Sequence, residues 1–107
     1  MLDKTLRLRK GDFDLLLKDG RTLSCPLLSV RFARFPRKAV AVSVSKKVAP
    51  LAVDRNRGRR RVYAILRKNW GLIPSKTAIG FSLRKECLKA SPTDLEQEIV
   101  SILKKIS

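Results

Sequence analysis

Three segments alternate bulky apolar residues with small or hydroxylated ones, and this pattern constrains the fold more than any other feature of the chain. They run from Leu28 to Phe35, from Ala39 to Ser45 and from Thr77 to Leu83. Because successive side chains of a strand point to opposite faces, each segment would give its strand one bulky face and one small face. The pattern predicts a sheet whose bulky face is covered by helices. The small face is either the seat of another helix or an open groove.

Turn and helix signals separate these segments. Pro26 is expected to divide the region from Arg21 to Phe35 into two short strands, because proline cannot donate to a β-ladder. Residues 36–38 are expected to form the next turn. Ser91 is expected to cap a final helix in which leucine and isoleucine recur at helical spacing as far as Ile106.

The start of the chain is expected to lack a strand. Residues 1–10 read as an extended N-terminal arm, and residues 13–18 can form a short helix that stops at Gly20. With 107 residues, the whole chain has the length of a single domain, residues 1–107.

The segment from Asp54 to Asn69 is predicted to form a helix crowded with arginine, with Asp54 as its N-cap. Five of the seven residues from Arg55 to Arg61 are arginine, and no acidic residue occurs from Arg55 to Lys85. The arginines therefore have no acidic partner one turn away, and those near the helix start oppose the macrodipole. A charge run is usually a solvated face, but a segment this unfavourable locally is more typical of a polyanion-binding site.

A helical projection divides this segment into three groups. Val62, Ile65 and Leu66 form the stripe expected to face the core. Arg55 and Arg59 fall in line with that stripe and are expected to point toward the sheet edge. The opposite, outward face consists of Arg57, Arg60, Arg61, Arg67 and Lys68.

The charge balance indicates a nucleic acid partner. Lysine and arginine number 25 against 9 acidic residues, which gives a net charge of +16. A membrane is less favoured, because no apolar run approaches a spanning length and the basic segment lacks an aromatic belt. A small-residue sheet face beside Phe13 suits a single strand, which favours RNA over duplex DNA. A structural RNA-binding protein of the ribosome-associated type and a basic DNA-binding module are the alternatives.

Few residues are candidates for catalysis by the protein itself. The chain has no histidine, and its acidic residues form no close constellation beyond the scattered Asp12, Asp14 and Asp19. Cys25 and Cys87 lack metal-ligand spacing, so we expect no metal site and two reduced thiols. No signal peptide is apparent, and we expect a cytoplasmic protein.

Two stretches carry a resemblance to a known family. Residues 42–47 read Val-Ser-Val-Ser-Lys-Lys, and after a short connection residues 55–60 read Arg-Asn-Arg-Gly-Arg-Arg. This combination resembles the bacterial ribonuclease P protein subunit, and the resemblance spans nearly the whole chain. It implies an α+β fold, an α-β-β-β-α-β-α two-layer sandwich with a four-stranded sheet and a left-handed βαβ crossover. Strand twist alone would favour a right-handed crossover.

The resemblance also implies a function. In that family a catalytic RNA with bound Mg²⁺ removes the 5′ leader from precursor tRNA, and the protein assists by binding RNA. We therefore expect no catalytic residue on the protein, with Mg²⁺ held mainly by the RNA subunit and the substrate. The expected partners are the ribonuclease P catalytic RNA and precursor tRNA, with no membrane and no obligate protein partner.

The resemblance and the projection together select site residues. The residues expected to contact RNA are Lys46, Lys47, Arg55, Asn56, Arg57, Arg59, Arg60, Arg61 and Arg67. The leader groove is expected to include Phe13, Leu17, Arg31 and Phe32, although ordinary core is an even alternative for Phe13 and Phe32. Three positions depart from the family pattern: Leu17 replaces a second groove aromatic, Gly58 a typical aliphatic residue, and Tyr63 a common basic residue.

Overall fold

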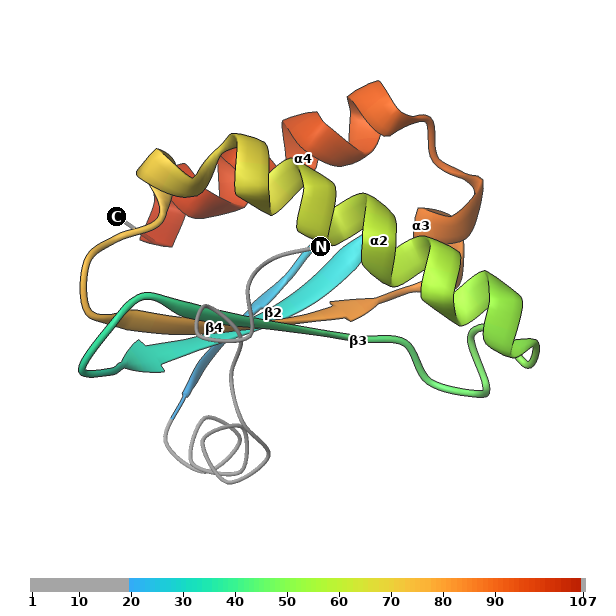
Figure 1. Ribbon diagram of the computed structural model, residues 1–107, viewed down its shortest axis with the longest axis horizontal. Helices are drawn as coiled ribbons and strands as arrows, with labels where there is room; N and C mark the ends of the chain where they lie inside the picture. The colour runs from blue at the N-terminus through green and yellow to red at the C-terminus, as the bar shows by residue number, and fades with distance from the viewer. Residues whose placement is uncertain (1–19, 107) are drawn as a thin grey trace.

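Helices cover one face of a four-stranded sheet in the computed structural model, which describes residues 20–106 (Figure 1). The elements in chain order are β1 (Arg21–Ser24), β2 (Leu28–Arg34), β3 (Ala39–Ser43), α2 (Ala52–Lys68), the 3-10 turn η2 (Trp70–Leu72), β4 (Thr77–Leu83), α3 (Lys85–Lys89) and α4 (Pro92–Ile106). The expected arm at residues 1–10 and the helix over residues 13–18 lie outside the described residues.

The sheet is mixed, with the strand order β1-β2-β4-β3. β2 is antiparallel to both β1 and β4, whereas β3 runs parallel to β4. The chain passes from β3 to β4 through α2. In Figure 1 both strands run from left to right, β3 lies nearer the viewer, and α2 lies above them, so the crossover is left-handed. This is the hand that the resemblance implied and the opposite of the common one.

The strand register places the bulky side chains on the helix side. Val30, Phe81 and Val42 form one row across three strands, and all three are buried. The neighbouring row pairs Ile79 with Val40, and both are fully buried. These rows pack with apolar residues of α2 and α4 into one core, which confirms the predicted two-layer arrangement.

The other face of the sheet carries small and hydroxylated residues. Ser24, Ser29, Ser82 and Ser43 align in one row across all four strands. The hydroxyl oxygens of Ser43 and Ser82 lie 3.2 Å apart, within hydrogen-bond distance. Helices α2, α3 and α4 all lie on the opposite side of the sheet (Figure 1), so no helix in residues 20–106 covers this face.

Most predicted boundaries are confirmed. Pro26 separates β1 from β2, and the strand predicted over Thr77–Leu83 is observed with the same limits. The Ser91 hydroxyl accepts a hydrogen bond from the Asp94 backbone N–H at 3.1 Å, as expected of a helix cap. No helix among the described residues is long and apolar enough to span a membrane.

Two local predictions were wrong, and one short helix was not predicted. β3 ends at Ser43 rather than Ser45. The basic helix begins at Ala52, so Asp54 lies in its first turn, and Leu51 takes the cap position without a side-chain hydrogen bond. The short helix α3 was not foreseen, because its five residues are too few to show a helical period.

Candidate nucleic-acid interface

Helix α2 is held on the sheet by one apolar face. Val62 and Leu66 are fully buried, as the projection predicted, whereas Ile65 is half-buried. Tyr63 is also buried and belongs to the core. The resemblance implies a basic residue at this position, and an aromatic ring anchors the helix instead.

The outward face of α2 is cationic. Its exposed members are Asn56, Arg57, Arg60, Arg67 and Lys68. Arg61, which was expected to join them, is half-buried and lies beside a small cavity lined in part by Cys87 and Leu88. The expectation was wrong because α3 packs against this side of α2, and α3 was missing from the sequence-based fold.

Arg55 and Arg59 are half-buried, in keeping with their place in the projection. The Arg55 guanidinium turns back onto the connection between β3 and α2, where Nη1 donates to the carbonyl oxygens of Ala49 and Pro50, each at 2.9 Å. The Arg59 guanidinium donates to the Asn56 side-chain oxygen. Both arginines therefore have protein partners, and Arg55 contacts the connecting segment rather than the sheet.

Lys46 and Lys47 lie in the turn that follows β3, and both are exposed. The backbone N–H groups of Val48 and Ala49 donate to the Ser45 carbonyl at 3.1 and 3.0 Å, which closes this turn. The turn and the first residues of α2 lie at the same end of the molecule (Figure 1). The two lysines thus extend the cationic surface of α2 beyond the helix start.

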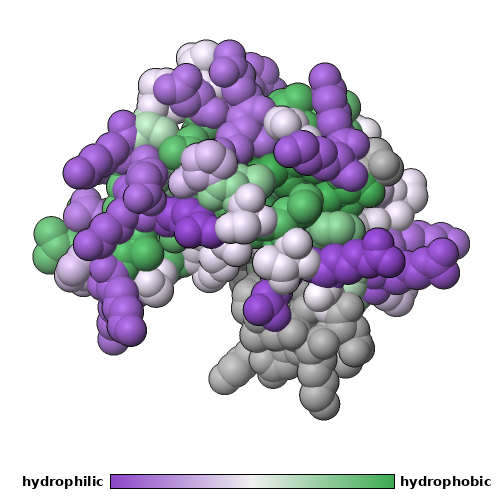
Figure 2. Space-filling model, turned by 180° about the vertical axis from the view of Figure 1, so that it is seen from behind, coloured by the Kyte–Doolittle hydropathy of each residue, from purple (hydrophilic) through white to green (hydrophobic). Residues whose placement is uncertain are grey.

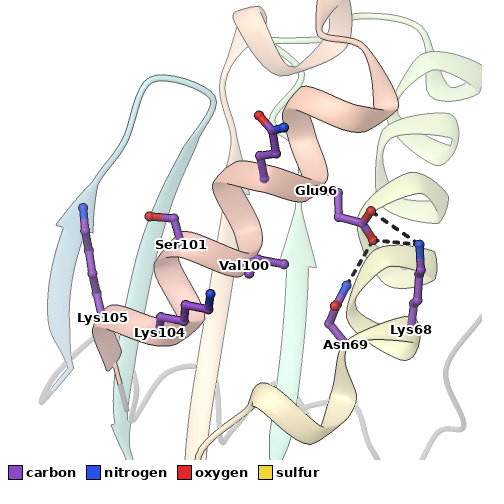
Figure 3. A pocket seen from close by; sticks show the side chains of 8 residues that line it. Lys68, Asn69, Glu96, Val100, Ser101, Lys104 and Lys105 are labelled. Carbon is purple, nitrogen blue, oxygen red and sulfur yellow. Dashed lines mark hydrogen bonds and ion pairs between the residues drawn. The ribbon is translucent and has the colours of Figure 1, made fainter.

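The charge of α2 is almost unneutralised within residues 20–106. Its one ion pair there joins Lys68 Nζ to Glu96 of α4 at 3.4 Å, and Asn69 donates to the same carboxylate at 3.2 Å (Figure 3). No arginine of α2 pairs with an acidic side chain in this part of the protein. An exposed row of arginines without an acidic partner in residues 20–106 is suited to a polyphosphate chain.

The residues expected to form the leader groove are not all brought together. Arg31 pairs with Gly80 on the small face of the sheet. Phe32 pairs with Ile79, points to the helix side and packs against the core, which agrees with the alternative reading of this residue. Phe13 and Leu17 lie outside the described residues. A groove on the small face can therefore include Arg31 but not Phe32.

The cysteines are free thiols. Cys25 is half-buried and Cys87 is buried, and burial is the main cause that raises the pKa of Cys87 to about 11. In residues 20–106 no three or more histidine, cysteine, aspartate or glutamate side chains are grouped so that they could hold a metal ion.

Sequence reasoning missed two features of the surface. Leu51 and Val53 are strongly exposed apolar residues at the start of α2. At the other end of the sheet, the Arg37 guanidinium lies 5.4 Å from the centre of the Phe35 ring. Neither feature has a periodic signal, although an apolar pair inside a cationic segment could have been noticed.

Comparison with known proteins agrees with this geometry. A family model described as Ribonuclease P matches residues 2–107. A ribonuclease P protein component from Desulfosudis oleivorans is 29% identical over 102 residues, covering 94% of this chain and 84% of that protein. The structure of the RNase P protein from Thermotoga maritima matches with a TM-score of 0.85 at 28% identity, covering 94% of this chain and 97% of that one. The Staphylococcus aureus RNase P protein matches with a TM-score of 0.84 at 20% identity, covering 97% of each chain, and supports the fold alone.

Proposed function

The chain belongs to the ribonuclease P protein family, and we propose that it is the RNA-binding protein subunit of ribonuclease P, which removes the 5′ leader from precursor tRNA. Beyond family membership, the observation that carries the proposal is the outward face of α2. Arg57, Arg60 and Arg67 are exposed on a helix anchored in the core, and no arginine of α2 pairs with an acid in residues 20–106.

In the proposed holoenzyme the catalytic RNA carries out the phosphodiester cleavage. Mg²⁺ would be held mainly by that RNA and the substrate, and would supply charge stabilisation at oxygen there. The protein contributes binding. Guanidinium groups of α2 and the ammonium groups of Lys46 and Lys47 contact phosphates. These contacts reduce the repulsion between the catalytic RNA and the precursor tRNA, and they raise the local concentration of substrate at the RNA surface.

The proposed leader contact is the small face of the sheet. Arg31 lies on that face and is half-buried, and its neighbours there are serine, alanine and glycine residues without bulky side chains, a composition that suits an extended single strand. Phe13 and Leu17 remain predicted members of this groove. We also propose that the assembly is cytoplasmic.

Cleavage of precursor tRNA by the partner RNA at low Mg²⁺, with and without the protein, tests the proposal. The protein is expected to raise the cleavage rate or the substrate affinity, and the Arg57→Ala/Arg60→Ala variant is expected to lose most of that gain while it remains folded. If the protein binds the RNA without any gain in cleavage, the proposal is wrong, and the alternative of a structural RNA-binding protein is supported.

A further inference from the structure

Two large apolar side chains are exposed at the start of the basic helix. Leu51 and Val53 expose 67% and 65% of their surface, and Leu72 at 39% is the other large exposed apolar residue in the described part of the chain. Pro50 and Ala52 are exposed as well, and we call residues 50–53 the apolar tip. In Figure 2 the start of α2 lies at the left edge, where apolar side chains protrude among hydrophilic ones.

The backbone of the apolar tip is fixed by hydrogen bonds. Arg55 Nη1 binds the carbonyl oxygens of Ala49 and Pro50, each at 2.9 Å. The backbone N–H groups of Asp54 and Arg55 donate to the Leu51 carbonyl at 3.1 and 3.2 Å. The tip is therefore presented in one conformation before any partner binds, which lowers the entropic cost of binding.

The surroundings of the tip are cationic. The exposed Lys46 and Lys47 precede it, and the exposed Arg57 follows one turn into α2. Asp54 is the one acidic residue in the sequence from position 20 to position 85. A second copy of this chain, with a net charge of +16, would be repelled from this surface, whereas a polyanion would be attracted.

We propose that the apolar tip packs against the face of an unpaired nucleobase in the RNA that α2 binds, and that Arg55 is the positioning residue that holds the tip. The inference rests on the proposed function. Two side chains form a patch much smaller than the roughly 1,200 Å² or more of a specific protein interface. The area of the two side chains corresponds to that of one base. We expect this base to be unpaired, because the faces of stacked bases in a duplex are not accessible to a side chain.

The inference changes the role of Arg55. The family resemblance placed Arg55 among the residues that contact RNA directly, but its Nη1 donates to two carbonyl oxygens of the protein. Its effect on RNA affinity is therefore expected to pass through Leu51 and Val53.

The first test compares RNA affinities over a range of salt concentrations. The full-length Leu51→Ser/Val53→Ser variant is expected to bind the partner RNA roughly three- to tenfold more weakly, with an unchanged dependence on salt because no phosphate contact is lost. The matched control is Leu72→Ser, which changes the other large exposed apolar residue of residues 20–106 and should leave affinity unchanged. Wild-type affinity in the double variant, or an equal loss in the control, would overturn the inference.

A second test identifies the contacted group by chemical probing of the RNA bases. The wild-type complex is expected to protect at least one unpaired base, and the double variant should restore its reactivity while backbone protections remain. If no base protection depends on the tip, or if the wild-type protein self-associates through it in sedimentation experiments, the tip does not bind a base.

The role of Arg55 is tested by a double-mutant cycle. Arg55→Ala should weaken binding, and Leu51→Ser should then cost much less than it does in the wild-type background, because the tip is already released. Additive losses, together with a salt slope lowered by about one, would show that Arg55 contacts phosphate directly. If wild-type protein fails to bind the RNA, the proposed function itself fails. If wild type and variants bind equally, only this inference fails.

Discussion

Gly58 shows how packing can require a residue that is unfavourable for a helix. A Cβ atom at this position would lie 2.8 Å from Leu83 Cδ2 and 3.4 Å from Leu88 Cδ2. Gly58 and Leu83 are both buried, so the Leu83 side chain would have to shift within the core to admit a methyl group. From the sequence, Gly58 was a departure from the family pattern, in place of a typical aliphatic residue. The structure gives a packing reason, since α2 approaches the end of β4 and the helix α3 closely here.

Gly58→Ala is therefore expected to destabilise the protein, although alanine favours helix. Overpacking costs ~1–3 kcal/mol, and the gain in propensity is at most ~1 kcal/mol, so a net loss of about 1 kcal/mol would lower Tm by about 4–8 °C. Thermal unfolding of wild type and Gly58→Ala measures the change in Tm. Gly71→Ala is the matched control, because nothing lies within 4 Å of its Cβ position. Equal Tm values for both variants would contradict this account.

The two cysteines should differ in reactivity. The thiolate is the reactive form, and burial raises the pKa of Cys87 to about 11, so very little thiolate exists at neutral pH. Alkylation of the native protein followed by mass spectrometry is expected to modify the half-buried Cys25 first and Cys87 only after unfolding. Rapid modification of Cys87 in the folded protein would show that the α2–α3 contact opens readily.

At the scale of elements, α4 secures the turn between β1 and β2 through Glu98. The Leu27 backbone N–H donates to both carboxylate oxygens, at 3.0 and 3.2 Å. Desolvation is the main cause of the raised pKa of Glu98, and the N–H groups of Leu27 and Leu28 oppose it. A sheet edge and a helix distant in sequence are thus joined by one half-buried carboxylate.

The raised pKa predicts a pH dependence of stability. The folded state holds the Glu98 proton more tightly than the unfolded state, so this stabilising contribution is complete below the ordinary glutamate pKa and is lost as pH rises through the folded pKa. The free energy of unfolding of wild type should therefore fall relative to Glu98→Gln as pH rises through that window. Denaturant unfolding at several pH values measures the difference. If the free energy of unfolding of wild type rose relative to that of Glu98→Gln, the folded-state pKa of Glu98 would be lowered rather than raised.

At the scale of the whole molecule, the fold separates anchoring from binding. Tyr63, Val62 and Leu66 anchor one face of α2 in the core. The opposite face keeps its cations in solvent, away from the acidic residues of α4 except at Lys68. Affinity for RNA should therefore depend on electrostatics that can be changed without loss of the fold.

Arg57→Ala is expected to weaken RNA binding and to lower the slope of log affinity against log salt by about one, because one phosphate contact is lost. Binding titrations at several salt concentrations measure the slope. Lys105→Ala is the control, since Lys105 is an exposed cation at the far end of α4, and its slope should match that of wild type. A wild-type slope for Arg57→Ala would mean that this side chain does not touch phosphate.

The sequence by itself determined the features that depend on neighbouring residues. These are the alternating strands, the division at Pro26, the cap at Ser91 and the excess of cations in α2. They were predictable because side-chain alternation, proline geometry and capping act over a few residues.

The tertiary structure alone decided the features that depend on contacts between distant segments. The strand order and the partial burial of Arg61 behind α3 follow from how elements pack. The left-handed crossover was implied by family resemblance, and local physics favoured the other hand. The exposure of Leu51 and Val53 and the hydrogen bonds of Arg55 beside them were also visible only in the structure. The pattern of residues along the sequence does not indicate that the Arg55 guanidinium turns back onto the preceding segment.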